Sequence, residues 1–432
     1  MHNSKTSYLS VGIDIGADFS LMSVALPTQE IVGNAYRINH DNLLSIQGAI
    51  SRIRGLESEH NLQSKVFMES TSIYHLPLYY RFKDEEFEVF VLNPLITHAN
   101  RNINIRSIHN DKFDSQKIAL IGLKPKLKIS VIPDDYTAAV KVMMREYHSM
   151  KKECTMLACR LTSQLRQTFP QYLKLFSQIN GNTSLEILYR YTTPENIMTA
   201  DKDEFVALIA KASSRNLTNA ECKYEQLVQA ATQANSFGHS NNGNIILIRH
   251  IVEMIRFNQE QTQRLLEKIE QIIYEQPNSK LANQIRLIES IPGAGFVTAA
   301  TVACEIGDFS AFRRPKHLYA YFGLDPKVRQ SGHFTGTELK MSKRGSPYAR
   351  RSIYILALQS ISVNKNREPK NPVLREYYLK KCESKAKMTA IGAVMHKVCN
   401  IIFAVLRDEK PFALVTPQQH LEAYTAALDV AA

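Results

Sequence analysis

Hydrophobic and polar positions alternate along the first part of the chain in a way that predicts strands followed by helices. Residues 9–37 contain three β-rich runs separated by short turns, which predicts three consecutive strands. Helical periodicity over 40–60, 74–84 and 111–123 then alternates with strand-like runs over 65–70 and 87–92. This order predicts a mixed sheet covered by helices, an α/β fold.

Two later stretches carry apolar residues at alternating steps of three and four. One runs from Val140 to Leu161 and the other from Ile248 to Ile272, with Asn258 and Thr262 as polar positions. Such spacing is typical of coiled-coil helices, in which a polar position can fix the register. The two seams could pack on each other within one chain, but two long seams also favour a homo-oligomer, a dimer or a tetramer.

The change of pattern predicts three regions. A segment with two prolines follows the helix at 111–123 and ends the α/β region, and the character of the chain changes again near Leu287. We expect an α/β domain over residues 1–128, a helical coiled-coil region over 129–280 and a mainly helical domain over 281–432.

Composition and charge narrow the class of protein. The chain has 432 residues, of which 44% are hydrophobic, so it can bury a sizeable core and wholesale disorder is excluded. Its formal net charge of +12 favours a polyanionic partner, nucleic acid rather than a membrane. Residues 313–351 alone hold ten Lys or Arg and two acids, a local excess of +8 interrupted by Gly and Pro.

The six cysteines point to a reducing compartment. No two of them form a C-x-x-C pair, so a zinc ribbon or a thioredoxin-like site is not expected. The N-terminal residues lack a charged flank followed by an apolar signal run. We therefore expect reduced thiols in a cytoplasmic protein with no membrane contact. The cysteines are Cys154, Cys159, Cys222, Cys304, Cys382 and Cys399.

Carboxylates form the first candidate constellation. Asp14 interrupts an apolar strand, where a charge is costly unless it is paired, and Glu69 ends a later strand. Asp111 and Asp114 stand three apart at a helix start and so share one face. If the four converge at one end of the sheet, they can hold two divalent cations that clamp a phosphate displacement. Separately, Asp111 could be an N-cap, Asp114 a first-turn acid and Glu69 a solvated strand end.

The first strand has a competing interpretation. Its GIDIG sequence is similar to the phosphate loop of sugar-kinase and actin-like ATPases. That interpretation needs a second Asp-Gly phosphate turn and a Gly-rich adenosine segment, and the sequence has neither. It also leaves Asp111 and Asp114 without a role.

Two further motifs lie in the last third. The IPGAG turn, with Gly293 and Gly295, sits between two helical runs and is typical either of a helix-hairpin-helix phosphate contact or of an ordinary turn. Ser331 lies in a Ser-Gly loop, which is usually only a turn. Nearby cations could hold a phosphodiester and let a serine form a phosphoserine link, if its proton is accepted. These cations are Lys327, Arg329, Lys343 and Arg344.

The order of these motifs resembles the insertion-sequence-110 family of bacterial transposases and the related DNA invertases. The resemblance covers nearly the whole chain and is carried by GIDIG, MESTSIYHLPLYY, NDKFDSQKIALIGL, the segment from LIESIPGAG to RQSGHFTG, KMSKRGSPYARRSIYILAL and the C-terminal KMTAIGAVMHKVCNIIFAVLRDEKPF. It implies a RuvC-like, ribonuclease-H-type first domain, a coiled-coil linker and a C-terminal transposase domain.

The resemblance also implies a chemistry. It implies a Mg²⁺ (or Mn²⁺) site at Asp14, Glu69, Asp111 and Asp114, a nucleophilic Ser331, and DNA element ends and target as partners. It further implies guidance by a structured bridge RNA, and multimers in which the serine of one subunit completes the acidic site of another. The chain departs from the family pattern at Ile15, Gly16, Ser72 and Gln330, none of which is an expected catalytic group.

Three functions therefore stand at the level of sequence. The first is a transposase or recombinase that exchanges strands through a phosphoserine. The second is a Holliday-junction-type nuclease in which metal-bound water attacks and Ser331 is a turn residue. The third is a nucleic-acid-binding protein with an inactive acidic site. A covalent protein–DNA adduct separates the first from the second, and any metal-dependent cleavage excludes the third.

Overall fold

The computed structural model of the chain divides into two compact units, Met1–Pro133 and Asp134–Ala432. It describes residues 8–69, 74–92, 111–125, 132–213, 216–235, 241–326 and 340–415, with isolated positions at 127, 129–130, 330–331, 334–335, 418–419 and 422. The predicted three-part division is not the same as these two units, and it stays a prediction.

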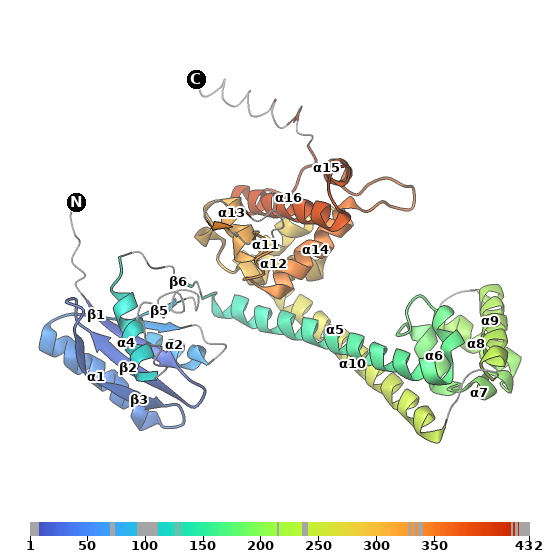
Figure 1. Cartoon of the computed structure of the whole chain (residues 1–432), viewed down its shortest axis with the longest axis horizontal. Coiled ribbons are helices and arrows are strands. Elements are labelled where there is room, and N and C mark those ends of the chain that lie inside the picture. The colour runs from blue at the N-terminus through green and yellow to red at the C-terminus, as the bar shows by residue number, and fades with distance from the viewer. Residues whose placement is uncertain are drawn as a thin grey trace. The chain divides into compact units, whose positions relative to one another are not determined.

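The first unit is built on a six-stranded mixed sheet, which confirms the predicted α/β fold (Figure 1). The strand order is β3-β2-β1-β4-β5-β6; β1 pairs parallel with β4 and β4 with β5, while the remaining pairs are antiparallel. The short β6 lies in the segment that the sequence indicated only as a break. The strands are β1 (Leu9–Ile15), β2 (Phe19–Ala25), β3 (Ile31–Asn39), β4 (Ser64–Glu69), β5 (Glu88–Leu92) and β6 (Ile129–Ser130).

Three described helices connect and cover these strands. α1 (Leu43–His60) starts at an Asn42 cap whose side chain accepts hydrogen bonds from the N–H groups of Leu44 and Ser45, and it ends in left-handed backbone at Asn61. α2 (His75–Asp84) precedes β5. α4 (Asp111–Gly122) packs against β1 and β2. The helices and strands expected over residues 9–123 are thus confirmed, with ends shifted by a few residues.

The second unit contains two helices of 34 residues each, α5 (Asp135–Thr168) and α10 (Asn242–Glu275), side by side (Figure 1). Tyr136 Oη donates to Ile272 O at 3.1 Å, and Asn244 Nδ2 donates to Gln164 Oε1 at 3.0 Å, so the helices run antiparallel. The two predicted seams therefore pack on each other within the chain. Thr262 is buried at this contact, and its hydroxyl donates to Asn258 O.

Short helices fill the chain between α5 and α10 and surround a hydrophobic cluster of their own. Tyr172, Phe169 and Phe205 are fully buried there, and Leu161 of α5 and Ile255 of α10 belong to the same cluster. The opposite ends of α5 and α10 belong to a different cluster. The intervening elements are a 3₁₀ turn (Pro170–Lys174), α6 (Asn182–Arg190), α7 (Pro194–Met198), α8 (Lys202–Ser213) and α9 (Leu217–Asn235).

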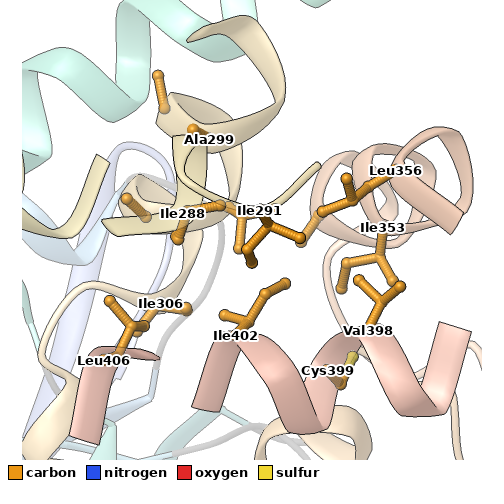
Figure 2. Packing of buried hydrophobic residues seen from close by; sticks show 14 of the residues in the cluster. Ile288, Ile291, Ala299, Ile306, Ile353, Leu356, Val398, Cys399, Ile402 and Leu406 are labelled. Atoms are coloured by element: carbon orange, nitrogen blue, oxygen red, sulfur yellow. The ribbon is translucent and has the colours of Figure 1, made fainter. Parts of the chain in front are cut away.

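The last part of the chain is a helical core. Figure 2 shows Ile291, from the turn between two helices, enclosed by Leu356, Ile353 and Ile402. All four side chains are nearly or fully buried. The elements are α11 (Lys280–Glu289), α12 (Phe296–Ile306), a 3₁₀ turn (Phe309–Ala311), α13 (Pro315–Tyr321), β7 (Gln330–Ser331), β8 (Phe334–Thr335), α14 (Pro347–Ile361), α15 (Pro372–Cys382) and α16 (Lys387–Asp408).

α16 is, among the described residues, the one helix long and apolar enough to cross a membrane. Its side chains Val398, Ile402 and Leu406 point into the core in Figure 2, and burial in that core accounts for its hydropathy. Three of the six cysteines, Cys154, Cys304 and Cys399, are buried, and burial raises the pKa of the Cys304 thiol to about 12. Such thiols are not reactive nucleophiles at neutral pH.

Candidate active site and nucleic-acid contacts

One face of β1 is made of small residues, and α4 lies directly on it. Ser10 Oγ donates to Ala119 O at 2.6 Å. A Cβ added at Gly12 would come within 2.1 Å of Ala119 N and 2.4 Å of Ser115 O, so only glycine allows this approach. The buried hydroxyls of Ser115 and Ser23 hydrogen-bond to each other at 2.8 Å.

These contacts set the direction of α4 along β1. Ser10 meets the helix at Ala119, and Gly12 meets it at Ser115 and Ala119, so helix and strand run in opposite directions. Two residues of a strand span about 6.6 Å and four residues of a helix span about 6 Å. Each step of two residues along β1 therefore corresponds to about one turn of α4. Asp14, two residues beyond Gly12 on the same face, is therefore directed toward the first turn of α4, where Asp111 begins the helix.

Glu69 occupies the equivalent place on the next strand. Ile13 pairs with Met68 in the parallel register of β1 and β4, so the next residues in step are Asp14 and Glu69. Neighbouring strands lie about 4.8 Å apart, and paired residues share a face. Phe67, two residues earlier, faces α4, because a Cβ added at Gly122 would meet its ring at 2.4 Å. Asp14 and Glu69 are both half-buried at the carboxyl end of the central strands.

The remaining acids are described less completely. Asp114 is half-buried and forms an ion pair with Lys117 at 3.3 Å, whereas the side chain of Asp111 lies outside the described residues. Among the side chains that the structure does describe, no group of three or more His, Cys, Asp or Glu could hold a metal. The structure thus brings Asp14 and Glu69 to one edge, beneath the helix that carries Asp111 and Asp114, and the four-carboxylate centre stays a prediction.

Ser331 lies on a two-strand hairpin. β7 and β8 pair antiparallel through Ser331 and Phe334, while the serine side chain, Lys327 and Arg329 fall outside the described residues. The two ends of the surrounding segment are tied together: Pro326 bridges to Met341, Ser342 N donates to Asp325 O at 2.7 Å, and Ser342 Oγ donates to the Asp325 carboxylate at 2.5 Å. These contacts form a fixed base for the hairpin.

Lys343 and Arg344 sit in a tight turn next to that base. Gly323 has a left-handed φ of 68°, and a Cβ at Gly345 would lie 1.8 Å from Tyr321 O, so the two chain segments touch backbone to backbone. Arg350 donates to Phe322 O and Gly345 O, and it is thereby a structural arginine. Both Lys343 and Arg344 are exposed, and neither forms an ion pair with a carboxylate of the described residues.

The IPGAG turn connects α11 and α12, as the pattern predicted. Gly293 has a φ of 97°, and a Cβ there would press against the backbone of α14 at Gln359 and Ser360. Ser360 Oγ donates to Pro292 O at 3.1 Å, which fixes this side of the turn. Gly295 is the N-cap of α12 and provides no side-chain cap, and a Cβ added there would meet no described atom within 4 Å. The open side could receive a phosphate, but an ordinary helix–helix turn has the same form.

The sequence patterns did not point to an ionic cluster between α5 and α12, in which two cations surround the buried Glu305. Arg145 donates to both oxygens of Glu305, at 2.7 and 3.0 Å, and Lys141 lies 3.4 Å from the same carboxylate. Burial raises the pKa of Glu305, but the hydrogen bonds and charges of Arg145 and Lys141 outweigh it and leave the pKa below its ordinary value. The signal was a lone Glu in the apolar run VTAATVACEI, opposite basic residues four apart on the seam helix.

Comparison with known proteins gives the same family for both ends of the chain. Residues 11–170 match the DEDD transposase domain of the IS110 family, and residues 285–378 match the domain described as the transposase IS116/IS110/IS902 family. Relatives include an IS110 insertion-element protein of Streptomyces coelicolor, 22% identical over 69% of this chain and 71% of its own length.

Two further relatives carry functional names. The pilin gene-inverting protein of Moraxella bovis is 27% identical over 52% of this chain and 65% of its own length. The transposase for insertion sequence element IS1111A of Coxiella burnetii is 30% identical over 31% of this chain and 36% of its own length. The chain thus spans just under two thirds of the inverting protein and about a third of the IS1111A transposase.

Proposed function

The chain belongs to the IS110/IS116/IS902 family of transposases, and from that premise we propose that it recombines DNA through a serine nucleophile and an acidic metal site. The family makes it a DNA transposase or recombinase, and a DEDD domain indicates a divalent-metal requirement. The finer assignment is our proposal: Ser331 as the nucleophile and Mg²⁺ (or Mn²⁺) held by the four carboxylates.

One observation carries the metal assignment. Asp14 and Glu69 directly follow a pair of residues that are matched across the parallel strands β1 and β4. They share the face of the sheet on which α4 lies, at the end where α4 begins. Half-buried carboxylate oxygens are the donors that hard divalent cations prefer, so these residues fit the group. A bound cation would polarise the phosphate and stabilise charge on its oxygens. Asp14 and Glu69 would bind it from the sheet, and Asp111 and Asp114 from the helix.

The serine step conserves the number of phosphodiester bonds. Ser331 Oγ forms a bond to phosphorus, the bond from phosphorus to the departing sugar oxygen breaks, and the serine proton ends on that oxygen. Reversal on a second strand rejoins DNA without an external energy source. Lys327, Arg329, Lys343 and Arg344 would hold the phosphates on either side. The paired ends at Asp325 and Ser342 support this role, because they hold the base of the hairpin.

Two partners belong to the same proposal. A structured bridge RNA would select the DNA sites, and two or four copies of the chain would act together; the net charge of +12 favours binding to both nucleic acids. RNA that co-purifies with the protein and maps next to its gene supports guidance. A protein that recombines DNA after complete RNase treatment contradicts it.

The adduct experiment tests the central step. Labelled element-junction DNA, Mg²⁺ and any co-purified RNA are incubated with the protein and run on a denaturing gel. We expect a labelled band at protein size with the unmodified chain and none with Ser331→Ala. Ser346→Ala, which removes a helix-capping hydroxyl nearby, is the matched control and should keep the band. Cleaved DNA without an adduct, equal in Ser331→Ala, would show that water attacks instead.

A further inference from the structure

A group of cations that have no acidic partner among the described residues lies beside the ionic cluster around Glu305 in the second unit. On α5, Lys141 and Arg145 share the single carboxylate of Glu305. The next turns of the same helix present His148, Lys151 and Lys152, and residues three and four apart on a helix are neighbours. Both lysines are exposed, and neither pairs with a carboxylate in the part of the chain that the structure describes.

The first turn of α14 completes this group. The His148 ring lies 5.6 Å from the ring of Tyr348, and the Arg145 guanidinium lies 5.5 Å above the same ring. Arg351, three residues after Tyr348, is exposed and close enough for its charge to act on His148 and Tyr147. Arg351 likewise has no described acidic partner. We call His148, Lys151, Lys152, Tyr348 and Arg351 the junction patch.

The neutral ring of His148 is held in one tautomer within this patch. Thr301 Oγ1 donates its hydrogen to Val297 O at 2.6 Å, so it accepts from His148 Nε2 at 2.9 Å. His148 therefore carries its proton on Nε2, and Nδ1 is the titrating nitrogen. Burial, followed by the charge of Arg351, lowers the pKa of His148, so the imidazole is neutral at pH 7.

We propose that the junction patch binds the phosphate backbone of DNA and takes up a proton at His148 when it does so. Lys151, Lys152 and Arg351, exposed on two helices, form a site for a polyanion. A phosphate at Arg351 offsets the positive charge that disfavours the imidazolium and adds a negative charge beside it. The groups shown to contact His148 or to act on its charge are Tyr147 on α5, Thr301 and Glu305 on α12, and Tyr348 and Arg351 on α14. Lys141, Arg145, Lys151 and Lys152 are the cations three to seven positions away on α5.

This inference rests on the proposed DNA partner, but it does not rest on Ser331 or on the metal site. Those sites belong to the chemical step, whereas the patch contributes to binding. Tyr348 and Arg351 lie within the basic stretch over residues 313–351, but none of the patch residues is among the individual nucleic-acid contacts expected from the sequence.

The test measures binding of the full-length protein to a fluorescein-labelled DNA duplex of mixed sequence by anisotropy, in EDTA so that no cleavage occurs. Each phosphate contact contributes about 0.9 to the slope of log K against log salt. We expect Arg351→Ala to reduce the slope by about 0.9 and the double variant Lys151→Ala, Lys152→Ala by about 1.8. Arg264→Ala is the control: it changes the charge equally, but its arginine is paired with Glu260.

The pH arm isolates His148. Binding by the unmodified chain should tighten as the pH is lowered from 7, by up to about tenfold per pH unit if one proton is taken up. His148→Gln keeps a donor for Thr301 but cannot titrate, so that tightening should be smaller. If the slope of log K against log salt is the same for Arg351→Ala as for Arg264→Ala, the junction patch does not bind phosphate and the proposal is wrong.

Two other outcomes distinguish a failure of the proposed DNA partner from a failure of the junction patch. If the unmodified chain and Asp14→Ala both fail to bind any duplex, the DNA partner itself is wrong. If the variants lose binding only to an RNA duplex of the same sequence, the patch is an RNA contact and the proposal fails.

Discussion

The acidic edge of the first unit and the serine hairpin of the second are held in place in different ways. Asp14 and Glu69 stand on adjacent strands of a central sheet, where backbone pairing and the approach of α4 to Gly12 fix their positions. Ser331 stands on a two-residue strand between chain ends that are joined by Asp325, Ser342 and one bridge. The first site is placed by extended pairing within a sheet, whereas the second is placed by a few backbone contacts and one side-chain hydrogen bond at its base.

The two regions also differ in charge. The four candidate acids of the first unit all carry negative charge when ionised, and we propose that a divalent cation binds among them. Residues 313–351 of the second carry an excess of +8 and repel one another unless a polyanion binds. In our proposal the ligand of each region, a divalent cation at the acids and a polyanion at the basic stretch, has the opposite charge.

The largest expected effect comes from removing a strand carboxylate. Asp14→Ala should reduce strand cleavage by at least about 10³-fold, because loss of a cation ligand removes charge stabilisation in the transition state. Folding should be largely unchanged, since the substitution shortens a half-buried side chain near a strand end and opens no cavity in the core. Asp84→Ala, at the other end of the sheet where α2 ends, is the control and should cleave normally. If Asp14→Ala cleaves DNA at the rate of the control, this edge of the sheet is not part of the active site.

Removing a cation from the ionic cluster around Glu305 should cost more unfolding free energy than neutralising the carboxylate. Arg145→Ala leaves the Glu305 carboxylate, 3% exposed, with Lys141 alone and should lower the free energy of unfolding by about 3–5 kcal/mol. Glu305→Gln leaves cations that can reach water and keeps an acceptor, so its cost should be about 1–3 kcal/mol. Urea unfolding followed by circular dichroism measures both, and equal costs would contradict the asymmetry.

The same cluster predicts an acid limit to stability. The pKa of Glu305 in the folded chain lies below its ordinary value of 4.5, so ionisation of Glu305 stabilises the fold above that pH. This stabilisation is lost as pH falls from about 4.5 through the native pKa of Glu305. The unmodified chain should therefore lose more stability than Glu305→Gln over that range. Thermal melting measured across this pH range checks the prediction. If the two proteins lose stability equally as the pH falls, Glu305 does not set the acid limit.

The contact between helix and sheet can be tested without touching an acid. Gly12→Ala places a Cβ against the backbone of α4, which cannot move aside as a flexible side chain would. We expect a loss of about 1–3 kcal/mol in unfolding free energy and a loss of cleavage as the first turn of α4 shifts. Gly55→Ala on α1, where a Cβ meets no described atom within 4 Å, should be neutral or stabilising. Full activity of Gly12→Ala would mean that the position of α4 does not matter.

The sequence predicted the sheet well because strand periodicity is local. Alternation over residues 9–37 identified three strands, and a polar Asp14 among apolar neighbours marked the sheet edge where we propose the metal site. The closeness of α4 was not predicted, although the small residues Ser10 and Gly12 on the face of Asp14 are the pattern that a close helix requires. β6 was missed because two residues form too short a pattern to detect.

The second unit was predicted in outline only. The seams identified α5 and α10, but whether they pair within the chain or between copies depends on the intervening helices, which have no motif of their own. The pairing of Asp325 with Ser342 and of Arg145 with Glu305 joins residues 17 and 160 positions apart. No spacing rule links residues so distant, so these contacts could not be predicted from a single sequence.

The smallest expected effect concerns the turn beside the hairpin base. Lys343 and Arg344 are exposed and have no described acidic partner, and their backbone is fixed by Gly323 and Gly345. If both contact phosphates, the double variant Lys343→Ala, Arg344→Ala should reduce the salt slope of DNA binding by about 1.8 without changing the unfolding midpoint. The control double variant Arg190→Ala, Arg264→Ala removes two cations that are already paired with Glu186 and Glu260. Because the controls carry the same change in net charge, a difference between the two slopes measures contact rather than long-range attraction. Equal slopes would place the DNA elsewhere on the second unit, and the open side of Gly295 would then be the next surface to test.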